Sequence, residues 1–322
     1  MESIVTKSVK PESVPNIPPK LKLITLDLTE FLAKNYPPKT MLLAPWLPSK
    51  GLAMVHAPRG TGKTFFALSV ALGVASGTSV LGWKPDRPKR VLYVDGEMSA
   101  GMNQERIGKL MAGMGLQSFP KDNLHILTLD DQKDFAGGLN LANTRHQNAL
   151  EACLQGIDLV ILDNLSCLYR NGDENSADSW DVMNDWLLQQ RRSGRSVLMI
   201  HHSGKGGQQR GTSRREDILD TVLCLKPLTG EKAKSGASFK VVAEKCRAFS
   251  GSAMQDVETE LINSGDCLIW KYRTKDLPTY EQVVDLYNHD FKQCEIASQL
   301  GINKSSVSKH LKNARKKGDV DG

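Results

Sequence analysis

The sequence predicts an α/β fold with a largely parallel sheet, followed by a small all-α domain toward the carboxyl-terminal end. The first observation is that short apolar runs alternate with helical patterns from about Leu42 to Arg273. The second is that several of these runs are continuously apolar, which is typical of strands covered on both faces. The third is a short basic block of helical pattern near the end of the chain.

Length and composition indicate a globular protein. The chain has 322 residues, of which 40% are hydrophobic and 24% charged, enough for one large domain and one small one. No apolar run approaches the length of a membrane span, so no membrane partner is expected. Residues 1–20 are polar and contain four prolines. They lack the apolar segment of a signal peptide, and we expect a disordered lead-in.

Cysteine usage points to the cytoplasm. The six cysteines occur singly, without a C-x-x-C pair. This scatter argues against a zinc site or a disulfide framework and favours reduced thiols in a cytoplasmic protein.

The strands of the core are expected where apolar runs are bounded by turn residues. Helical patterns fill the intervals, among them Thr64–Ser76 and Ser179–Arg192, the second with an apolar stripe. A proline-containing break at Asp276–Thr279 separates this core from the tail, so the expected divisions are 1–20, 21–275 and 279–318. The expected strands are Leu52–His56, Arg90–Asp95, Leu159–Asp163, Val197–His202, Thr221–Leu225, Phe239–Lys245 and Leu268–Tyr272.

The stretch HAPRGTGKTFFALS, residues 56–69, joins the first strand to the first helix. It matches the phosphate-loop pattern G-x-x-x-x-G-K-[ST], except that alanine replaces the first glycine. In such a loop, backbone N–H groups surround phosphate oxygens, the lysine neutralises them and the threonine hydroxyl coordinates Mg²⁺. Alanine is the smallest substitute for glycine. We therefore expect ATP and Mg²⁺ to bind at Ala57, Pro58, Arg59, Gly60, Thr61, Gly62, Lys63 and Thr64.

Two further strands end in carboxylates. LVILDNLS ends an apolar strand at Asp163, the position from which an aspartate holds Mg²⁺ in such sites. VLYVDGEMS ends another strand near Glu97, whose carboxylate can orient and deprotonate the attacking water. Taken alone, Asp163 could equally be a turn residue and Glu97 a charge placed at a helix start.

The segment GEMSAGMNQERI resembles the E-M-S motif after the second core strand of DnaB-type replicative helicases, which are RecA-like P-loop ATPases. The segment MIHHSGKG falls where that family carries a sensor residue, and its His-His form resembles the plasmid RepA-type hexameric helicases. The resemblance runs from about Pro45 to Tyr272. It implies a RecA-like ATPase core that assembles as a homo-hexamer. It also implies that Glu97 is the catalytic glutamate and that His202 senses the γ-phosphate. A plain buried or solvated histidine pair is the alternative.

The segment AEKCRAFSG resembles the K-x-R element by which one subunit of these rings reaches into the ATP site of its neighbour. The resemblance implies that Lys245 and Arg247 stabilise charge on the transferred phosphoryl group. Ala248 and Phe249 depart from the usual Asn-Gly. Arg210 is a second candidate for this role, and a solvated strand face is the alternative for the K-x-R pair.

In RecA-like rings, the loops after the Asp163 strand and after the sensor strand face the central channel. The first of these here, Tyr169–Asp178, is acidic and a poor phosphate ligand. The second, Gly204–Arg215, is rich in glycine and basic. We expect Lys205 and Arg210 to hold a DNA single strand by its backbone.

The tail predicts a helix-turn-helix domain that binds duplex DNA. Small residues in KQCEIASQLGINKSSVSKHLKNARKKG allow two short helices to cross closely, and the segment resembles the DNA-binding modules of response regulators and sigma factors. The first helix is expected at Tyr280–Asn288 and the recognition helix near Lys304. A protein-binding helical bundle is the alternative. The expected DNA contacts are Ser305, Ser306, Lys309 and His310 in the groove, and Lys312, Arg315 and Lys316 near phosphates.

Charge supports this interpretation of the tail. Residues 292–318 contain seven basic residues and one acidic residue, an excess equal to the net charge of +6 of the whole chain. A positive charge concentrated in one short block is typical of a nucleic-acid-binding appendage.

Three functions therefore remain open at this point. The first is a ring-forming, ATP-driven DNA helicase or translocase of a plasmid, phage or mobile element. The second is an ATP-switched DNA-binding regulator or helicase loader without unwinding activity. The third is a RecA-like recombination factor that forms filaments.

Overall fold

The computed structural model describes residues 23–38, 40–135, 137–170, 180–203, 214–228, 237–247, 254–274, 279–288 and 291–320. The chain divides into two compact units, residues 1–38 and 39–322. The described part of the first unit contains helix α1 (Leu28–Ala33). The Asp27 carboxylate caps this helix by accepting a hydrogen bond of 2.8 Å from the backbone N–H of Glu30.

The second unit is built on a nine-stranded sheet, counted over the residues that the structure describes. The strands, in chain order, are β3 (Leu52–Ala57), β4 (Val91–Asp95), β5 (Leu124–Thr128), β6 (Leu159–Asp163), β7 (Ser196–His202), β8 (Thr221–Pro227), β9 (Ser238–Cys246), β10 (Val257–Ser264) and β11 (Cys267–Thr274). Their order in space is β11-β10-β9-β8-β3-β7-β6-β4-β5. The six strands β8, β3, β7, β6, β4 and β5 run parallel to one another. Strands β9, β10 and β11 extend the sheet beyond β8 through antiparallel pairs.

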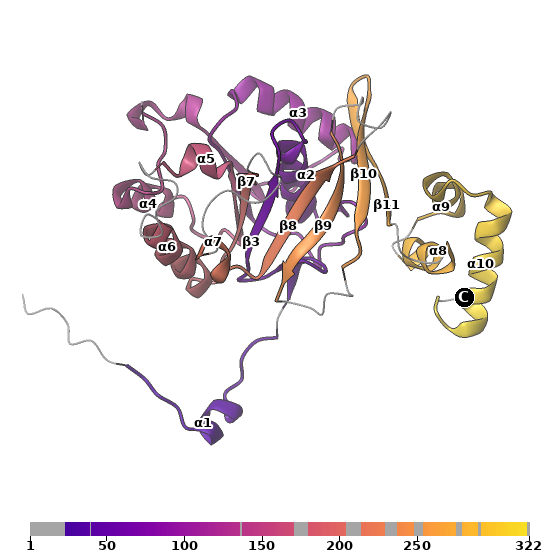
Figure 1. Ribbon diagram of the computed structural model, residues 1–322, viewed down its shortest axis with the longest axis horizontal. Helices are drawn as coiled ribbons and strands as arrows, with labels where there is room; N and C mark the ends of the chain where they lie inside the picture. The colour runs from indigo at the N-terminus through magenta and orange to yellow at the C-terminus, as the bar shows by residue number, and fades with distance from the viewer. Residues whose placement is uncertain are drawn as a thin grey trace, which may run out of the picture. The chain divides into compact units, whose positions relative to one another are not determined.

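Helices cover both faces of the parallel part (Figure 1). On one face, α2 (Lys63–Ser76) and α3 (Ala100–Gly113) pack with Val55, Tyr93 and Ile161. The opposite face packs against α4 (Thr144–Glu151), α5 (Leu165–Leu168) and α6 (Asp181–Arg192). Because side chains alternate along a strand, strands buried on both faces need the continuous apolar runs seen in the sequence. The α/β fold with a largely parallel sheet is confirmed.

Each expected strand is present, with bounds shifted by a few residues at most. Strands β5 and β10 were not predicted. In β5 the side chains are mostly half-buried, and β10 lies in the antiparallel extension of the sheet, so neither shows the continuous apolar run of the central strands. The other described elements of this unit are the antiparallel pair β1 (Met41–Leu43) and β2 (Leu47–Pro48), short 3₁₀ turns at Leu129–Asp131 and Lys133–Phe135, and α7 (Arg214–Asp217).

Three helices follow the sheet: α8 (Thr279–Asn288), α9 (Gln293–Leu300) and α10 (Lys304–Lys317). They share a small core in which Val283, Ile296, Val307 and Leu311 are fully buried. Between α9 and α10, Gly301 adopts φ 64°, and the Asn303 side chain caps α10 by accepting from the N–H of Ser306 at 2.7 Å. Helices α8 and α10 lie where the sequence predicts the first helix and the recognition helix.

None of the described helices is both long and apolar enough to cross a membrane.

Candidate active site

The phosphate loop connects the end of β3 to the start of α2. Gly60 and Gly62 adopt φ values of 76° and 104°, a left-handed conformation that lets successive N–H groups face inward as an anion-binding nest. The buried Lys63 ammonium donates to the carbonyls of Ala57 at 2.9 Å and Pro58 at 2.7 Å. Burial lowers the pKa of Lys63 to about 8, although the Asp163 and Glu97 carboxylates oppose this shift. The ammonium therefore lies in the loop, where bound phosphates would add favourable charge.

The missing first glycine has a structural explanation. Ala57 is the last residue of β3, where it pairs with His202 of β7 and is fully buried. Its φ is not among the positive values of the described residues. Since only a positive φ or a close approach requires glycine, alanine fits this position without strain.

The two loop glycines allow a matched prediction. A Cβ on Gly62 would lie 2.3 Å from the Cβ of Ala237, whereas a Cβ on Gly60 would meet nothing within 4 Å. We expect Gly62→Ala to lower the free energy of unfolding by about 1–3 kcal/mol and to weaken ATP binding clearly. Gly60→Ala carries only the backbone strain, about 1 kcal/mol. Urea unfolding and nucleotide titration measure both. Equal losses in the two variants would contradict the steric argument.

Asp163 lies at the end of β6, next to Asp95 at the end of β4 in the sheet register. It is buried and accepts a hydrogen bond of 2.6 Å from the Tyr93 hydroxyl. Burial raises the pKa of Asp163 to about 6, while hydrogen bonds from Tyr93 and Thr64 act in the opposite direction. The Thr64 hydroxyl thus lies near the Asp163 carboxylate. Both are oxygen donors of the kind that Mg²⁺ prefers, so the donor set fits this ion.

Glu97 follows β4 on a turn that Asp95 stabilises. The Asp95 Oδ1 accepts from the backbone N–H groups of Glu97 at 2.7 Å and Met98 at 2.8 Å. The Glu97 carboxylate accepts from the Asn164 side-chain amide and lies 4.0 Å from Nε2 of His202. About half of the Glu97 side chain remains exposed, at 52%. A carboxylate that is positioned by neighbours yet reachable by water suits a general base.

The four strand ends thereby bring together Lys63, Asp163, Glu97 and His202. The strands β3, β7, β6 and β4 are consecutive neighbours and run parallel, so their carboxyl ends share one edge of the sheet. The sequence predicted each of these residues separately, and the sheet order places them at one edge.

Lys245 and Arg247 lie elsewhere. Cys246 pairs with Thr221, which pairs with Ala53 near the beginning of β3. From Ala53 to Ala57, at the end of β3, the strand rises about 13 Å. The K-x-R pair therefore lies toward the amino ends of the parallel strands, away from the phosphate loop. The Lys245 ammonium donates to the carbonyl of Glu216, and Arg247 donates to the carbonyl of Asp217 at 2.6 Å. These cations are therefore remote from the phosphate loop of their own chain.

The expected single-strand contacts Lys205 and Arg210 fall outside the described residues, as does most of the acidic loop Tyr169–Asp178. Their roles stay predictions.

The expected duplex contacts divide on α10. Ser305, Lys309, Lys312 and Lys316 are exposed and spaced by four, three and four residues, which places them on one face of the helix. The remaining three make contacts within the C-terminal helices. Ser306 donates its backbone N–H to Asn303, the His310 ring lies 6.1 Å from the Tyr280 ring, and Arg315 donates to the Tyr287 hydroxyl at 3.2 Å.

Sequence reasoning missed three residues of the site, of which Tyr93 holds Asp163. Asn164 holds Glu97, and the buried Asn103 of α3 donates to Asp95. The only signal for Asn164 was its place directly after the strand-end aspartate. Asn103 carried none, because asparagine in a helix is usually solvated.

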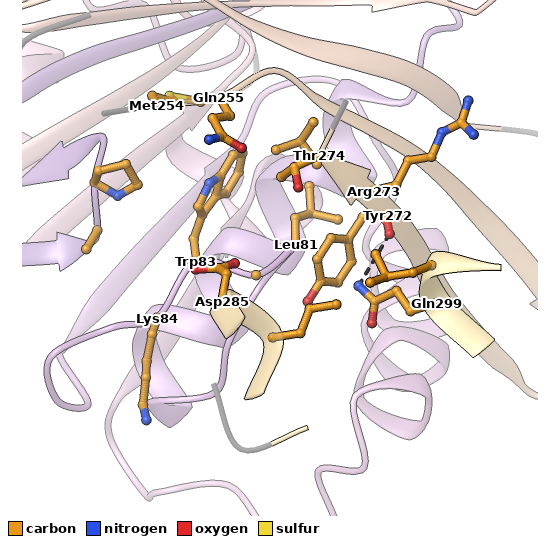
Figure 2. A pocket seen from close by; sticks show the side chains of 16 residues that line it. Leu81, Trp83, Lys84, Met254, Gln255, Tyr272, Arg273, Thr274, Asp285 and Gln299 are labelled. Atoms are coloured by element: carbon orange, nitrogen blue, oxygen red, sulfur yellow. Dashed lines mark hydrogen bonds between the residues drawn. The ribbon is translucent and has the colours of Figure 1, made fainter. Parts of the chain in front are cut away.

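A cavity of ≈ 330 Å³ lies where the C-terminal helices meet the sheet (Figure 2). Leu81, Trp83, Tyr272, Leu286 and Gln299 contribute to its lining. Gln299 of α9 donates to the carbonyl of Tyr272 in β11 at 3.3 Å. None of the phosphate-loop residues lines this cavity, so it is separate from the candidate active site.

A family model described as an AAA domain matches residues 17–208, which is more than half of the chain. The chain belongs to the AAA domain family. The match includes the phosphate loop, Glu97, Asp163 and His202, and it ends before the K-x-R pair and the C-terminal helices. Together with the parallel sheet and the phosphate loop at the end of β3, this membership identifies a P-loop ATPase core that binds ATP.

Two solved structures resemble the AAA domain protein. A KaiC-like protein from the hyperthermophilic archaeon Pyrococcus horikoshii OT3 is 14% identical with a TM-score of 0.49, over 71% of this chain and 93% of that one. The flagellar accessory protein FlaH from Methanocaldococcus jannaschii is 12% identical with a TM-score of 0.48, over 69% and 89%. Comparison with curated protein sequences gives no significant match.

Proposed function

We propose that this ATPase is a DNA helicase or translocase that works as a ring-shaped homo-oligomer in the replication of a plasmid, phage or mobile element. One observation carries the proposal. Each chain has a phosphate loop with Glu97 and His202 at one edge of its sheet, and the two cations Lys245 and Arg247 near the other edge. If these cations complete the ATP site, a neighbouring subunit must supply them, and a repeated head-to-tail contact of this kind forms a ring when its rotation closes.

The chemistry follows from the positions of the side chains. Lys63 and the loop N–H groups bind the phosphates, and Glu97 accepts a proton from the attacking water. Asn164 keeps the Glu97 carboxylate in place. Mg²⁺, when bound by Thr64 and Asp163, would neutralise charge on the phosphates. His202, next to Glu97 at the end of β7, is the group that would sense whether the γ-phosphate is present.

Coupling to DNA would use the loop that begins one residue after Ser203. Ser203 itself donates its N–H to the Ala57 carbonyl at 2.9 Å, so the start of this loop is tied to the phosphate loop. A change at the γ-phosphate therefore has a short path, through this hydrogen bond and the following backbone, to Lys205, which we propose as a single-strand contact. In the tail, the exposed face of α10 would contact duplex phosphates as part of a helix-turn-helix.

The concentration of positive charge in the last helices favours a second candidate, an ATP-switched duplex-binding regulator or helicase loader. A motor that binds only single-stranded DNA does not require a positively charged C-terminal domain. Electron microscopy with an ATP analogue and forked DNA, together with an unwinding assay, tests the proposal. Rings that separate the fork support the helicase. ATP turnover stimulated only by a specific duplex, without strand separation, would select the regulator.

The face of α10 gives a prediction with a charge-matched control. We expect the triple variant Lys309→Gln, Lys312→Gln and Lys316→Gln to weaken duplex binding. The slope of log affinity against log salt concentration should also become less steep by up to about 3, roughly 0.9 for each lost phosphate contact. ATP hydrolysis stimulated by single-stranded DNA should persist. The control replaces three exposed basic residues of the core, Arg87, Lys121 and Lys133, with glutamine. Equal salt slopes for the two variants would remove α10 from the duplex-binding surface.

A further inference from the structure

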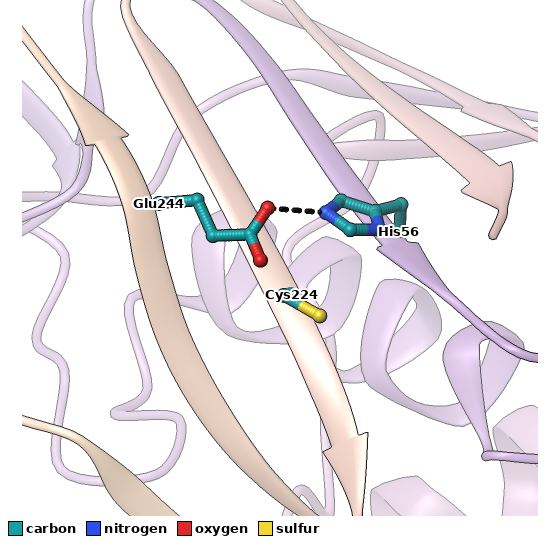
Figure 3. A group of neighbouring side chains, drawn as sticks. All are labelled: His56, Cys224 and Glu244. Atoms are coloured by element: carbon teal, nitrogen blue, oxygen red, sulfur yellow. Dashed lines mark hydrogen bonds and ion pairs between the residues drawn. The ribbon is translucent and has the colours of Figure 1, made fainter. Parts of the chain in front are cut away.

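Three side chains of the types that bind metal ions lie together on the sheet, and none of them belongs to the candidate ATP site. They are His56 of β3, Cys224 of β8 and Glu244 of β9 (Figure 3). One ligand atom from each lies within 4.8 Å of the other two. His56 and Glu244 are already in contact, with 2.7 Å between Nε2 and Oε2. Neighbours of His56 in the strand, Val55 and Ala57, pack with α2, so the trio lies on the opposite face of the sheet.

The register of strands β3, β8 and β9 brings these three side chains together. His56 and Cys224 are direct partners in the parallel pair β3–β8. In the pair β8–β9, Leu223 is opposite Ala243 while Val222 is opposite Lys245, so Glu244 is an extra residue in a β-bulge. A bulge redirects a side chain that a regular strand would place elsewhere. Here it turns the Glu244 carboxylate toward the other two groups, as Figure 3 shows.

The surroundings suit a metal ligand set. His56 and Cys224 are buried, with exposed fractions of 1% and 3%, whereas the Glu244 side chain is 40% exposed and gives access from solvent. The other ring nitrogen of His56, Nδ1, lies 2.9 Å from the hydroxyl oxygen of Ser203. Such a second partner holds the imidazole with Nε2 directed at a metal.

We propose that His56, Cys224 and Glu244 form a binding site for a zinc-type divalent cation, with a fourth position open to water or an external ligand. One thiolate, one imidazole and one carboxylate form a ligand set that Zn²⁺ accepts readily, whereas Mg²⁺ and Ca²⁺ select oxygen ligands only. The site is distinct from the Mg²⁺ position at Thr64 and Asp163. It escapes sequence inspection because its ligands are far apart in the chain and none of them belongs to a C-x-x-C pair.

A metal at this place would join three parts of the ATPase. His56 immediately precedes Ala57 of the phosphate loop, Ser203 follows the sensor His202, and Glu244 precedes Lys245 of the K-x-R pair. The ion would cross-link β3, β8 and β9 and stabilise their mutual positions. We therefore expect bound Zn²⁺ to raise the midpoint of thermal unfolding, since a ligand that binds only the folded state stabilises it.

Cobalt substitution of the full-length protein, without nucleotide or Mg²⁺, tests the site. We expect one equivalent of Co²⁺ per chain to produce a sulfur-to-cobalt charge-transfer band and the visible bands of a tetrahedral site, and Zn²⁺ to displace it. Cys224→Ser should abolish the charge-transfer band. Cys246→Ser is the matched control, because this partly buried thiol lies two residues after Glu244 on the same strand. It should keep the band. Glu244→Gln should weaken Zn²⁺ binding at least about tenfold.

Absence of the band in the wild-type protein, or its persistence in Cys224→Ser, would overturn the proposal. Loss of the band in Cys246→Ser with retention in Cys224→Ser would assign the metal to another thiol and overturn it equally. Glu244→Gln covers the case in which Cys224→Ser does not fold, because its side chain is partly exposed and the amide oxygen can still accept a hydrogen bond. Unchanged Zn²⁺ affinity and an unchanged Zn²⁺-induced rise in unfolding temperature in this variant would also contradict the site.

Discussion

Glu97→Gln is expected to lower the rate of ATP hydrolysis by about 10²-fold or more, while nucleotide affinity stays close to that of the wild type. The amide keeps the size of the side chain and can still contact Asn164, but it cannot accept a proton from water. Lys63 and the loop N–H groups, which bind the phosphates, are unchanged. Single-turnover hydrolysis and equilibrium nucleotide binding measure the two effects separately.

Glu105→Gln provides the control for this substitution. Glu105 lies on α3 eight residues after Glu97, is exposed, and pairs with Lys109 at 2.8 Å without contact to the active site. The charge change is the same, and turnover should be unaffected. If Glu97→Gln hydrolyses ATP as fast as Glu105→Gln, then Glu97 is not the general base.

Mixing two inactive variants is expected to restore activity, if the active site is shared between subunits. Lys63→Ala removes the cation that binds phosphates in its own site, and Arg247→Ala removes the cation offered to the neighbouring site. Each variant alone should lose ATP turnover, the second by about 10³-fold or more. At equal proportions, random ring assembly leaves about a quarter of the interfaces with an intact loop facing an intact Arg247. Turnover measured across mixing ratios should peak near that composition.

The double variant Lys63→Ala with Arg247→Ala is the control for mixing. Combined with either single variant it cannot rebuild a complete interface, so no activity should return. Subunit exchange must be shown independently, for example by energy transfer between labelled subunits. Exchange without rescue at any ratio would count against the shared site. In the structure, Lys245 and Arg247 donate to carbonyls of α7, so engagement of a neighbour requires these two hydrogen bonds to be exchanged.

The sequence by itself determined the elements and the phosphate chemistry. Central strands such as β6 and β7 are buried on both faces, and burial on both faces demands an unbroken apolar run that is visible without any structure. The phosphate loop is equally local, because its glycines, Lys63 and Thr64 act through one short backbone segment. Strand-end carboxylates could be assigned for the same reason: a polar residue directly after a buried run lies at the edge of a sheet. Strand β5 escaped because it is mostly half-buried, and β10 escaped because its buried residues include the polar Glu258 and Thr259, which interrupt the apolar run.

Only the tertiary structure decided which of these groups meet. Strand order and register bring Asn164 and His202 to Glu97, carry Lys245 and Arg247 toward the opposite edge, and gather the three side chains of the proposed metal site from separate strands. The physical reason is that pairing in a sheet joins residues far apart in the chain, and a single bulge, as at Glu244, changes which side chains share a face. Local pattern records whether a residue is buried, but not the partner beside which it is buried.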